Sequence, residues 1–122
     1  MDSRLENLKN VIGDLDVEKG VNYCGGDEEF YIDVLNDYVE ENRQDVIEQL
    51  FADENYADYA VEVHALKSTS RTLGIEGMGN LAEKLEHAVK DGDIDYVKAN
   101  HAEAMSCLTN ILDNIKTLVI EA

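Results

Sequence analysis

His64 is the residue of this sequence with the clearest chemical potential, because small and basic residues share its side of a predicted helix. Between Tyr59 and Gly74, apolar residues recur at steps of three and four, which predicts one buried helical face: Tyr59, Val63, Leu66 and Leu73. At about 100° per residue, His64 falls on the opposite side, with the small and basic residues Ala57, Ala60, Lys67, Ser68 and Arg71. An exposed imidazole beside cations, with room for a second protein, is typical of a site for an incoming anion.

Length and composition favour one compact domain over residues 1–122. The chain contains no proline, and 27 Asp and Glu against 10 Lys and Arg give a formal net charge of −17. Such an acidic surface repels nucleic acid and anionic membranes, so we expect neither as a partner. No apolar run approaches the roughly 20 residues of a membrane span. We expect a cytoplasmic monomer.

The two cysteines, Cys24 and Cys107, form no CxxC motif and lie far apart in the sequence. Free thiols are therefore the favoured interpretation, and a disulfide between them is the alternative.

Apolar periodicity predicts helices along the whole chain, separated by short polar breaks. Two short segments cover about 3–12 and 14–23, and Gly25-Gly26 then interrupts the chain. Asp27 is a predicted N-cap for a long helix that continues to about Phe51 along Phe30, Val34, Tyr38, Val46 and Leu50.

Three further helices follow the long one. The first carries His64 and ends at Gly74 in a left-handed cap. The second stops at Asp91-Gly92-Asp93, and the last runs to about Ile120. These elements predict an all-α fold: an antiparallel up-down-up-down four-helix bundle over 27–120, with one or two short N-terminal helices over 1–24 that cap one end.

The residues around His64 resemble the signature of histidine-containing phosphotransfer (HPt) domains. The matching positions are His64-Ala65-Leu66-Lys67-Ser68, Gly74, Ile75, Met78, Ala82 and Leu85-Glu86. Upstream, Leu15–Gly20, Gly26–Tyr31 and Leu35 are similar to the family's usual lead-in. One departure is Ser68, because the family usually has glycine directly after the lysine.

The resemblance implies a role for several residues. His64 would be the phosphoacceptor, and Lys67 would be the cation that stabilises its phosphate. We expect the Lys67 side chain to be exposed, so it should affect the transfer rate more than the stability. Glu86 falls where the family often has a Gln or Glu that accepts a hydrogen bond from the imidazole and leaves Nε2 free to attack; a solvated helix acid is the alternative. Gly74 would permit the turn and close packing.

Other residues enter as supporting candidates. Helix geometry adds Arg71, and Lys90 lies one turn beyond Glu86. The Ser68 hydroxyl is a candidate bond donor to a phosphate oxygen, and Ala60 leaves room for docking.

The function that the resemblance implies is a phosphorelay intermediate. His64 would accept a phosphoryl group from a receiver-domain aspartate and pass it to another receiver. The expected partners are response-regulator receiver domains or a hybrid sensor histidine kinase. The receiver would supply Mg²⁺ and an acidic pocket, so we expect no cofactor in this chain. Without an ATP-binding motif, we expect neither autokinase activity nor an enzyme.

Two rival interpretations remain open. A non-catalytic helical interaction module, in effect a degenerate HPt domain, would bind receivers or a kinase without chemistry. A histidine-dependent hydrolase is disfavoured because the sequence offers no oriented base for it.

No metal site is expected from the sequence. Asp91–Asp95 begins like a calcium loop, but Tyr96 takes the required glycine position. His87 and His101 show no metal-ligand spacing, and His101 is better explained as a partly buried packing residue.

Overall fold

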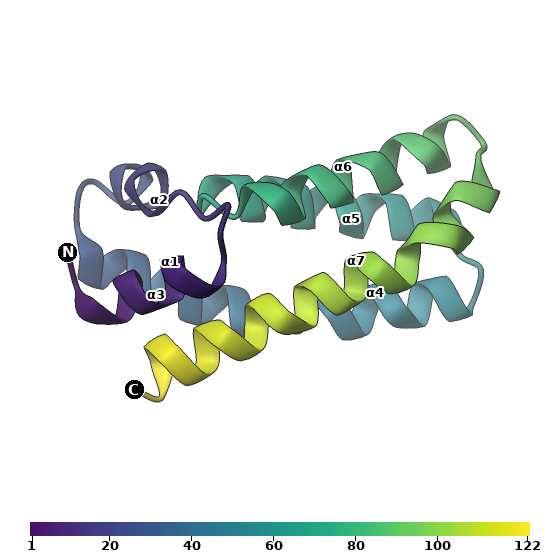
Figure 1. The fold of residues 1–122 in the computed structure, drawn as a ribbon. Helices are drawn as coiled ribbons and strands as arrows, with labels where there is room; N and C mark the ends of the chain where they lie inside the picture. Colours follow the sequence, from purple (N-terminus) through teal and green to yellow (C-terminus); the bar gives the residue numbers. More distant parts are fainter.

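Every regular element of this protein is a helix. The computed structural model describes residues 1–122 and contains α1 Ser3–Val11, α2 Val17–Tyr23, α3 Glu28–Glu40, α4 Arg43–Ala52, α5 Tyr56–Thr72, α6 Glu76–Lys90, α7 Ile94–Ile115 and a terminal π-helical turn, η1 Lys116–Ile120 (Figure 1). The predicted all-α class is confirmed. No helix combines the length and the apolar content that crossing a bilayer would require.

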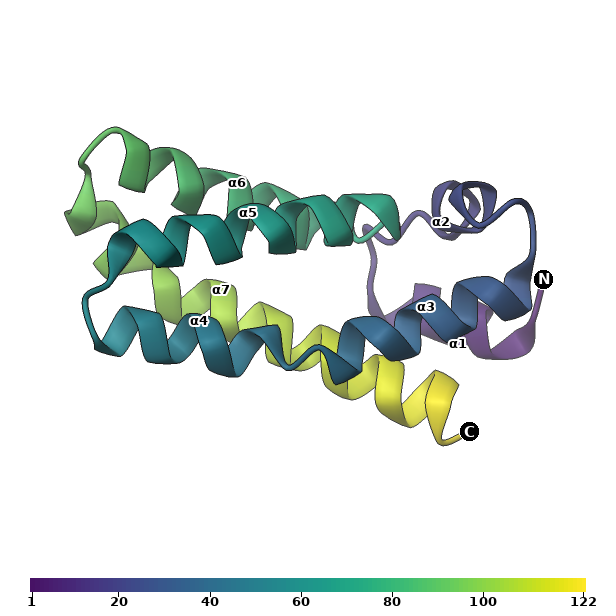
Figure 2. The same cartoon turned by 180° about the vertical axis from the view of Figure 1, so that it is seen from behind.

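The long helices lie side by side in two layers. In both views α5 and α6 form one layer, and α4 and α7 lie beneath them (Figures 1 and 2). The short helices α1 and α2 lie at the end of the molecule where α5 turns into α6, and the C-terminal part of α7 extends toward the same end. The N-terminal residues therefore cover the turn between α5 and α6.

The prediction of a single long helix from Asp27 to Phe51 is wrong. The chain forms α3 and α4 instead, because Asn42 between them adopts the left-handed conformation with φ 54°. A residue with positive φ ends an α-helix, and asparagine tolerates this conformation better than most residues.

The buried face of this region also differs from the predicted one. Phe30 and Val46 are exposed, and the buried residues are Tyr31, Ile32, Leu35 and Tyr38 in α3 and Ile47 in α4. Within α3 the buried face is centred on Tyr31 and Leu35, one residue beyond the predicted Phe30 and Val34. The break at Asn42 then changes the helical phase, so one stripe cannot continue from α3 into α4.

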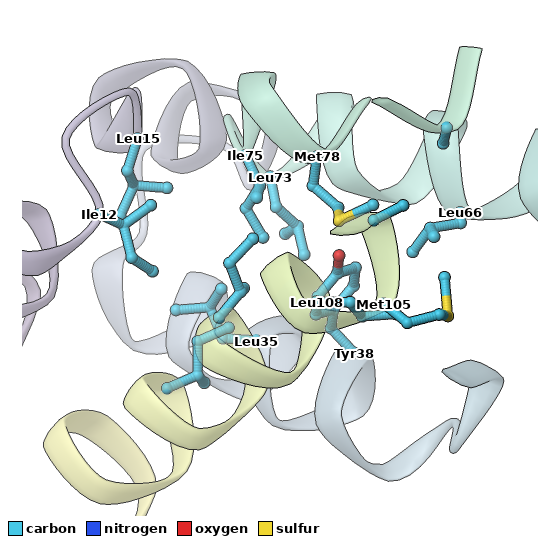
Figure 3. Close-up of a cluster of buried hydrophobic side chains, with 14 of the residues drawn as sticks. Ile12, Leu15, Leu35, Tyr38, Leu66, Leu73, Ile75, Met78, Met105 and Leu108 are labelled. Atoms are coloured by element: carbon cyan, nitrogen blue, oxygen red, sulfur yellow. The ribbon is translucent and has the colours of Figure 1, made fainter. Parts of the chain in front are cut away.

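One apolar core joins the elements. It contains 27 buried residues, drawn from all seven α-helices, their connections and η1. Figure 3 shows its central part, where Leu73 and Ile75 from the α5–α6 turn lie among side chains of the N-terminal linker and of α3 and α7. The N-terminal helices are thus part of the same core as the bundle.

Three buried tyrosines connect helices through their hydroxyl groups. Tyr31 donates to the Leu73 carbonyl oxygen at 2.8 Å, and Tyr38 bonds to the Ser70 hydroxyl at 2.8 Å. Tyr59 bonds to Nδ1 of His101 at 2.9 Å. Because every buried side-chain polar atom has a partner, the polar groups of this core are satisfied.

His101 is buried, as a packing residue would be. Its ring stacks on Phe51 with the centroids 3.8 Å apart, and its Nε2 lies 2.6 Å from Oε1 of Glu48. The cluster therefore ties α7 to α4 and α5.

Candidate functional site

His64 lies on the outward face of α5. The N-cap of this helix is Asn55, whose side chain accepts the Asp58 amide at 3.2 Å. Tyr59, Val63 and Leu66 are buried, whereas 55% of the His64 side chain is exposed. The imidazole is thus held on a regular helix and is open to an approaching molecule.

A buried carboxylate from α6 orients the His64 ring. Oε2 of Glu86 lies 2.7 Å from His64 Nδ1, and only 3% of the Glu86 side chain is exposed. Burial alone would raise the pKa of Glu86, but hydrogen bonds from Lys67, Lys90 and His64 outweigh it and lower the pKa to about 2. Glu86 is therefore ionised at neutral pH, and it is not the solvated helix acid of the alternative interpretation.

The ionised Glu86 determines which ring nitrogen carries the proton. A carboxylate only accepts hydrogen bonds, so Nδ1 of His64 must donate. In the neutral imidazole, Nε2 then has a free lone pair. A histidine held in this way is arranged as a nucleophile through Nε2.

Two lysines share the same carboxylate. Lys67 Nζ lies 2.8 Å from Oε1 of Glu86, and Lys90 Nζ lies 3.1 Å from Oε2. They differ in burial, because 17% of the Lys67 side chain is exposed against 64% of Lys90. The expectation of an exposed Lys67 is wrong: α6 covers its side chain and its ammonium group neutralises a buried charge.

Arg71 does not join the Glu86 cluster. Its guanidinium forms an ion pair with Glu83 and donates to Asn80 Oδ1 at 3.1 Å, and the bond from Arg71 lowers the pKa of Glu83. Gly79 makes room for the aliphatic part of Arg71, because a Cβ there would lie 2.7 Å from Arg71 Cγ. Arg71 therefore ties α5 to α6, and we do not assign it to phosphate.

The remaining candidate residues, which lie at different distances from His64, are Ser68, Ala60 and Gly74. Ser68 is exposed and Ala60 half-buried, each one helical turn from His64 on the same side of α5. Gly74 lies away from the imidazole, in the turn after α5, with φ 79°. That φ confirms the predicted left-handed end of the helix.

Sequence reasoning missed Glu83 as a partner of Arg71. Glu83 and Glu86 are three residues apart and so share one face of α6. This spacing was the available signal, but the pairing also requires the register of α6 against α5, which the sequence does not give. The structure contains no cluster of His, Cys, Asp and Glu side chains arranged to hold a metal ion.

Comparison with protein families gives a direct match. The model of the family described as "Hpt domain" matches residues 33–118, more than half of the chain. The chain belongs to the Hpt domain family. Hpt domains are phosphotransfer modules of two-component phosphorelays, not kinases, and interact there with receiver domains and kinases. Comparison with curated proteins and with solved structures gave no match.

The match confirms the resemblance inferred from the residues around His64. His64, Lys67, Glu86 and Lys90 all lie within the matched part of this Hpt domain, whereas residues 1–32 lie outside it.

Proposed function

We propose that this Hpt domain is a phosphorelay intermediate that accepts a phosphoryl group on His64 from a receiver-domain aspartate and passes it to another receiver. One observation carries the proposal: the His64 ring is more than half exposed while its Nδ1 is held 2.7 Å from the ionised Glu86. Nε2 is then the nitrogen that faces an incoming phosphoryl group.

The transfer requires no group beyond these side chains and the partner. The Nε2 lone pair of neutral His64 forms the new N–P bond while the P–O bond to the receiver aspartate breaks, and the aspartate leaves as a carboxylate. Nδ1 keeps its proton, and Glu86 balances the positive charge that the phosphorylated ring acquires. The reverse reaction delivers the group to a second receiver. Phosphoryl transfer depends largely on positioning and charge, which this site supplies.

Lys67 and Lys90 supply positive charge beside the phosphoryl oxygens. Both ammonium groups already lie within 3.1 Å of the carboxylate that orients His64, so they are close to the reacting ring. Lys90, with its exposed side chain, is free to turn toward a phosphoryl group, and Ser68 offers a hydroxyl on the same side of α5. Mg²⁺ belongs to the receiver in this proposal, and this chain needs no cofactor.

We further propose that the four-helix bundle over 27–120 is antiparallel, with α3 and α4 together forming its first arm. Residues 1–24 then cap one end of a single domain over 1–122. The proposed setting is a monomer in the cytoplasm, with receiver domains or a hybrid sensor histidine kinase as partners.

Incubation with a phosphorylated receiver tests the proposal. Wild-type protein should acquire label that is stable to alkali and labile to acid, as expected for a phosphorylated histidine, and His64→Gln should acquire none while its circular dichroism spectrum stays helical. His87→Gln is the matched control, because 59% of the His87 side chain is exposed on α6, and it should label normally. Label on His64→Gln would show that another residue is the phosphoacceptor.

A degenerate Hpt domain is the alternative, and the replacement of the family's usual glycine by Ser68 is the observation that favours it. Such a module would bind a receiver and never become labelled. If the wild-type chain binds a phosphorylated receiver but acquires no label, the chain is a degenerate Hpt domain and the proposed function is wrong.

A further inference from the structure

The linker between α1 and α2 contacts the turn between α5 and α6 through backbone atoms. Leu15 and Ile75 form an antiparallel bridge, and the Asp16 amide donates to the Gly74 carbonyl at 2.8 Å. Leu15 is buried, and Figure 3 shows it in the same apolar cluster as Ile75 and Leu73. This docking segment, residues 13–20, lies wholly outside the part of the chain that matches the Hpt family model.

Glycines make the close approach feasible. A Cβ on Gly74 would lie 1.9 Å from the Asp16 carbonyl oxygen, and one on Gly77 would lie 1.9 Å from Oδ2 of Asp14. At Gly20, a Cβ would lie 2.2 Å from the Tyr31 ring and 2.7 Å from the Leu73 carbonyl oxygen. The docking segment therefore packs against the turn with no room for a methyl group.

A polar contact extends the docking to the first turn of α6. Lys19 Nζ lies 2.5 Å from Oε1 of Glu76, with both side chains partly exposed. The docking segment thus contacts the end of α5, the turn and the start of α6.

The position of this turn affects the distance between His64 and Glu86. Only Leu73, Gly74 and Ile75 separate α5 from α6, so a movement of α6 along α5 must pass through them. Glu86 lies ten residues beyond Glu76, about 15 Å along a rigid helix. A slip of about 1 Å at the turn would stretch the 2.7 Å bond between His64 and Glu86 beyond the range of a strong hydrogen bond.

We propose that residues 13–20 are a positioning segment for the His64 site: by holding the α5–α6 turn, they keep Glu86 in register with His64. The contact between Arg71 and Glu83 is a second tie between the same two helices, nearer the site. The effect on transfer rests on the proposed function, whereas the effect on the His64 ring does not.

The experiment compares two glycine substitutions that differ in available space. Gly20→Ala, in α2, drives a methyl group into Tyr31 and Leu73. Gly13→Ala, in the same docking segment, meets nothing within 4 Å and is the matched control. Gly77→Ala is the milder test variant, because the three atoms nearest to its methyl group all belong to the flexible carboxylate of Asp14. Gly77→Ala replaces Gly20→Ala as the test variant if Gly20→Ala does not fold.

Two measurements are made on each variant. The ¹⁵N chemical shifts of the His64 ring report which nitrogen carries the proton, and the labelling rate from a phosphorylated receiver reports transfer. We expect the His64 ring of the test variants to lose its strict preference for Nδ1–H. A 1 Å misplacement can reduce a rate by about 100-fold. Because the contact between Arg71 and Glu83 still joins α5 to α6, we expect a smaller decrease in the transfer rate, about threefold to tenfold. The concentration of receiver that gives half the maximal rate should not change.

Ring shifts and transfer rates equal to those of Gly13→Ala in every test variant that folds would overturn the proposal. If no variant and no wild-type protein becomes labelled, the proposed function fails, and the ring shifts still decide the inference.

Discussion

Glu86 connects the chemistry of His64 to the stability of the fold. In the unfolded chain its carboxyl takes up a proton near the ordinary pKa of 4.5, whereas in the folded chain it stays ionised down to about 2. The unfolded state therefore binds the extra proton first. The stability that the ionised cluster contributes is complete above about pH 4.5 and is lost as the pH falls toward 2.

The stability of the wild type should therefore depend on pH through Glu86. Between pH 5 and 3, the free energy of unfolding of the wild type should fall more steeply than that of Glu86→Gln, with a difference of about 1–3 kcal/mol over the whole window. Urea unfolding at several pH values measures both slopes. Parallel slopes would mean that Glu86 does not interact with its three partners as described.

Lys67 and Lys90 bond to the same carboxylate but should differ in their effect on stability. Lys67→Met leaves part of a buried charge uncompensated and should lower the free energy of unfolding by about 1–2 kcal/mol, less than the loss of a whole buried pair because Lys90 and His64 remain. Lys90→Met removes an exposed partner and should lower it by less than about 1 kcal/mol. Denaturant unfolding of the two variants compares them directly, and a larger loss for Lys90→Met would contradict the burial difference.

The sequence was informative about His64 and less so about its neighbours. The exposure of His64 follows from the spacing of Tyr59, Val63 and Leu66 on its own helix. The burial of Lys67 depends on α6, and the pairing of Arg71 depends on Glu83. Local periodicity specifies which side of a helix a residue occupies, but not which side chain of another helix faces it.

At the scale of elements, the break between α3 and α4 was not predicted. Asn42 is a polar residue among polar residues, and nothing in its sequence context distinguishes it from a helix interior position. The left-handed conformation of Asn42, with φ 54°, separates the two helices without a proline or a glycine at that position. Gly74, in contrast, follows the last turn of a periodic helix, so its left-handed φ could be predicted.

Asn42 and Glu54 are the two residues other than glycine with positive φ, and substitutions at them should change stability in opposite directions. Asn42→Ala should lower the free energy of unfolding by about 1 kcal/mol, because alanine tolerates the left-handed conformation less well than asparagine. Glu54→Gly should raise it by a similar amount, because Glu54 has φ 56° and glycine removes that strain. Thermal unfolding measures both. The assigned backbone would be contradicted if Glu54→Gly were the destabilising variant.

At the scale of the whole molecule, the net charge of −17 acts against compactness. Like charges repel one another across the surface, and salt screens them. The melting temperature should therefore rise by a few degrees when the ionic strength increases from about 0.01 M to about 0.15 M, which shortens the Debye length from about 30 Å to about 8 Å. Scanning calorimetry at neutral pH measures the shift.

The control for this prediction is the same comparison near the isoelectric point, about pH 4.2, where the net charge vanishes and the salt effect should largely disappear. A melting temperature that falls with added salt at neutral pH would instead indicate that attractive ion pairs outweigh the repulsion.

The buried tyrosines give the chain an intrinsic optical signal of its integrity. Of the six tyrosines, Tyr31, Tyr38 and Tyr59 have a pKa raised by burial, and no tryptophan obscures their absorbance. These three phenols stay protonated in alkaline solution for as long as the helices remain packed. Phenolate absorbance from these three will therefore appear only in molecules whose core has opened, so part of the absorbance change in alkali reports that opening without any added dye.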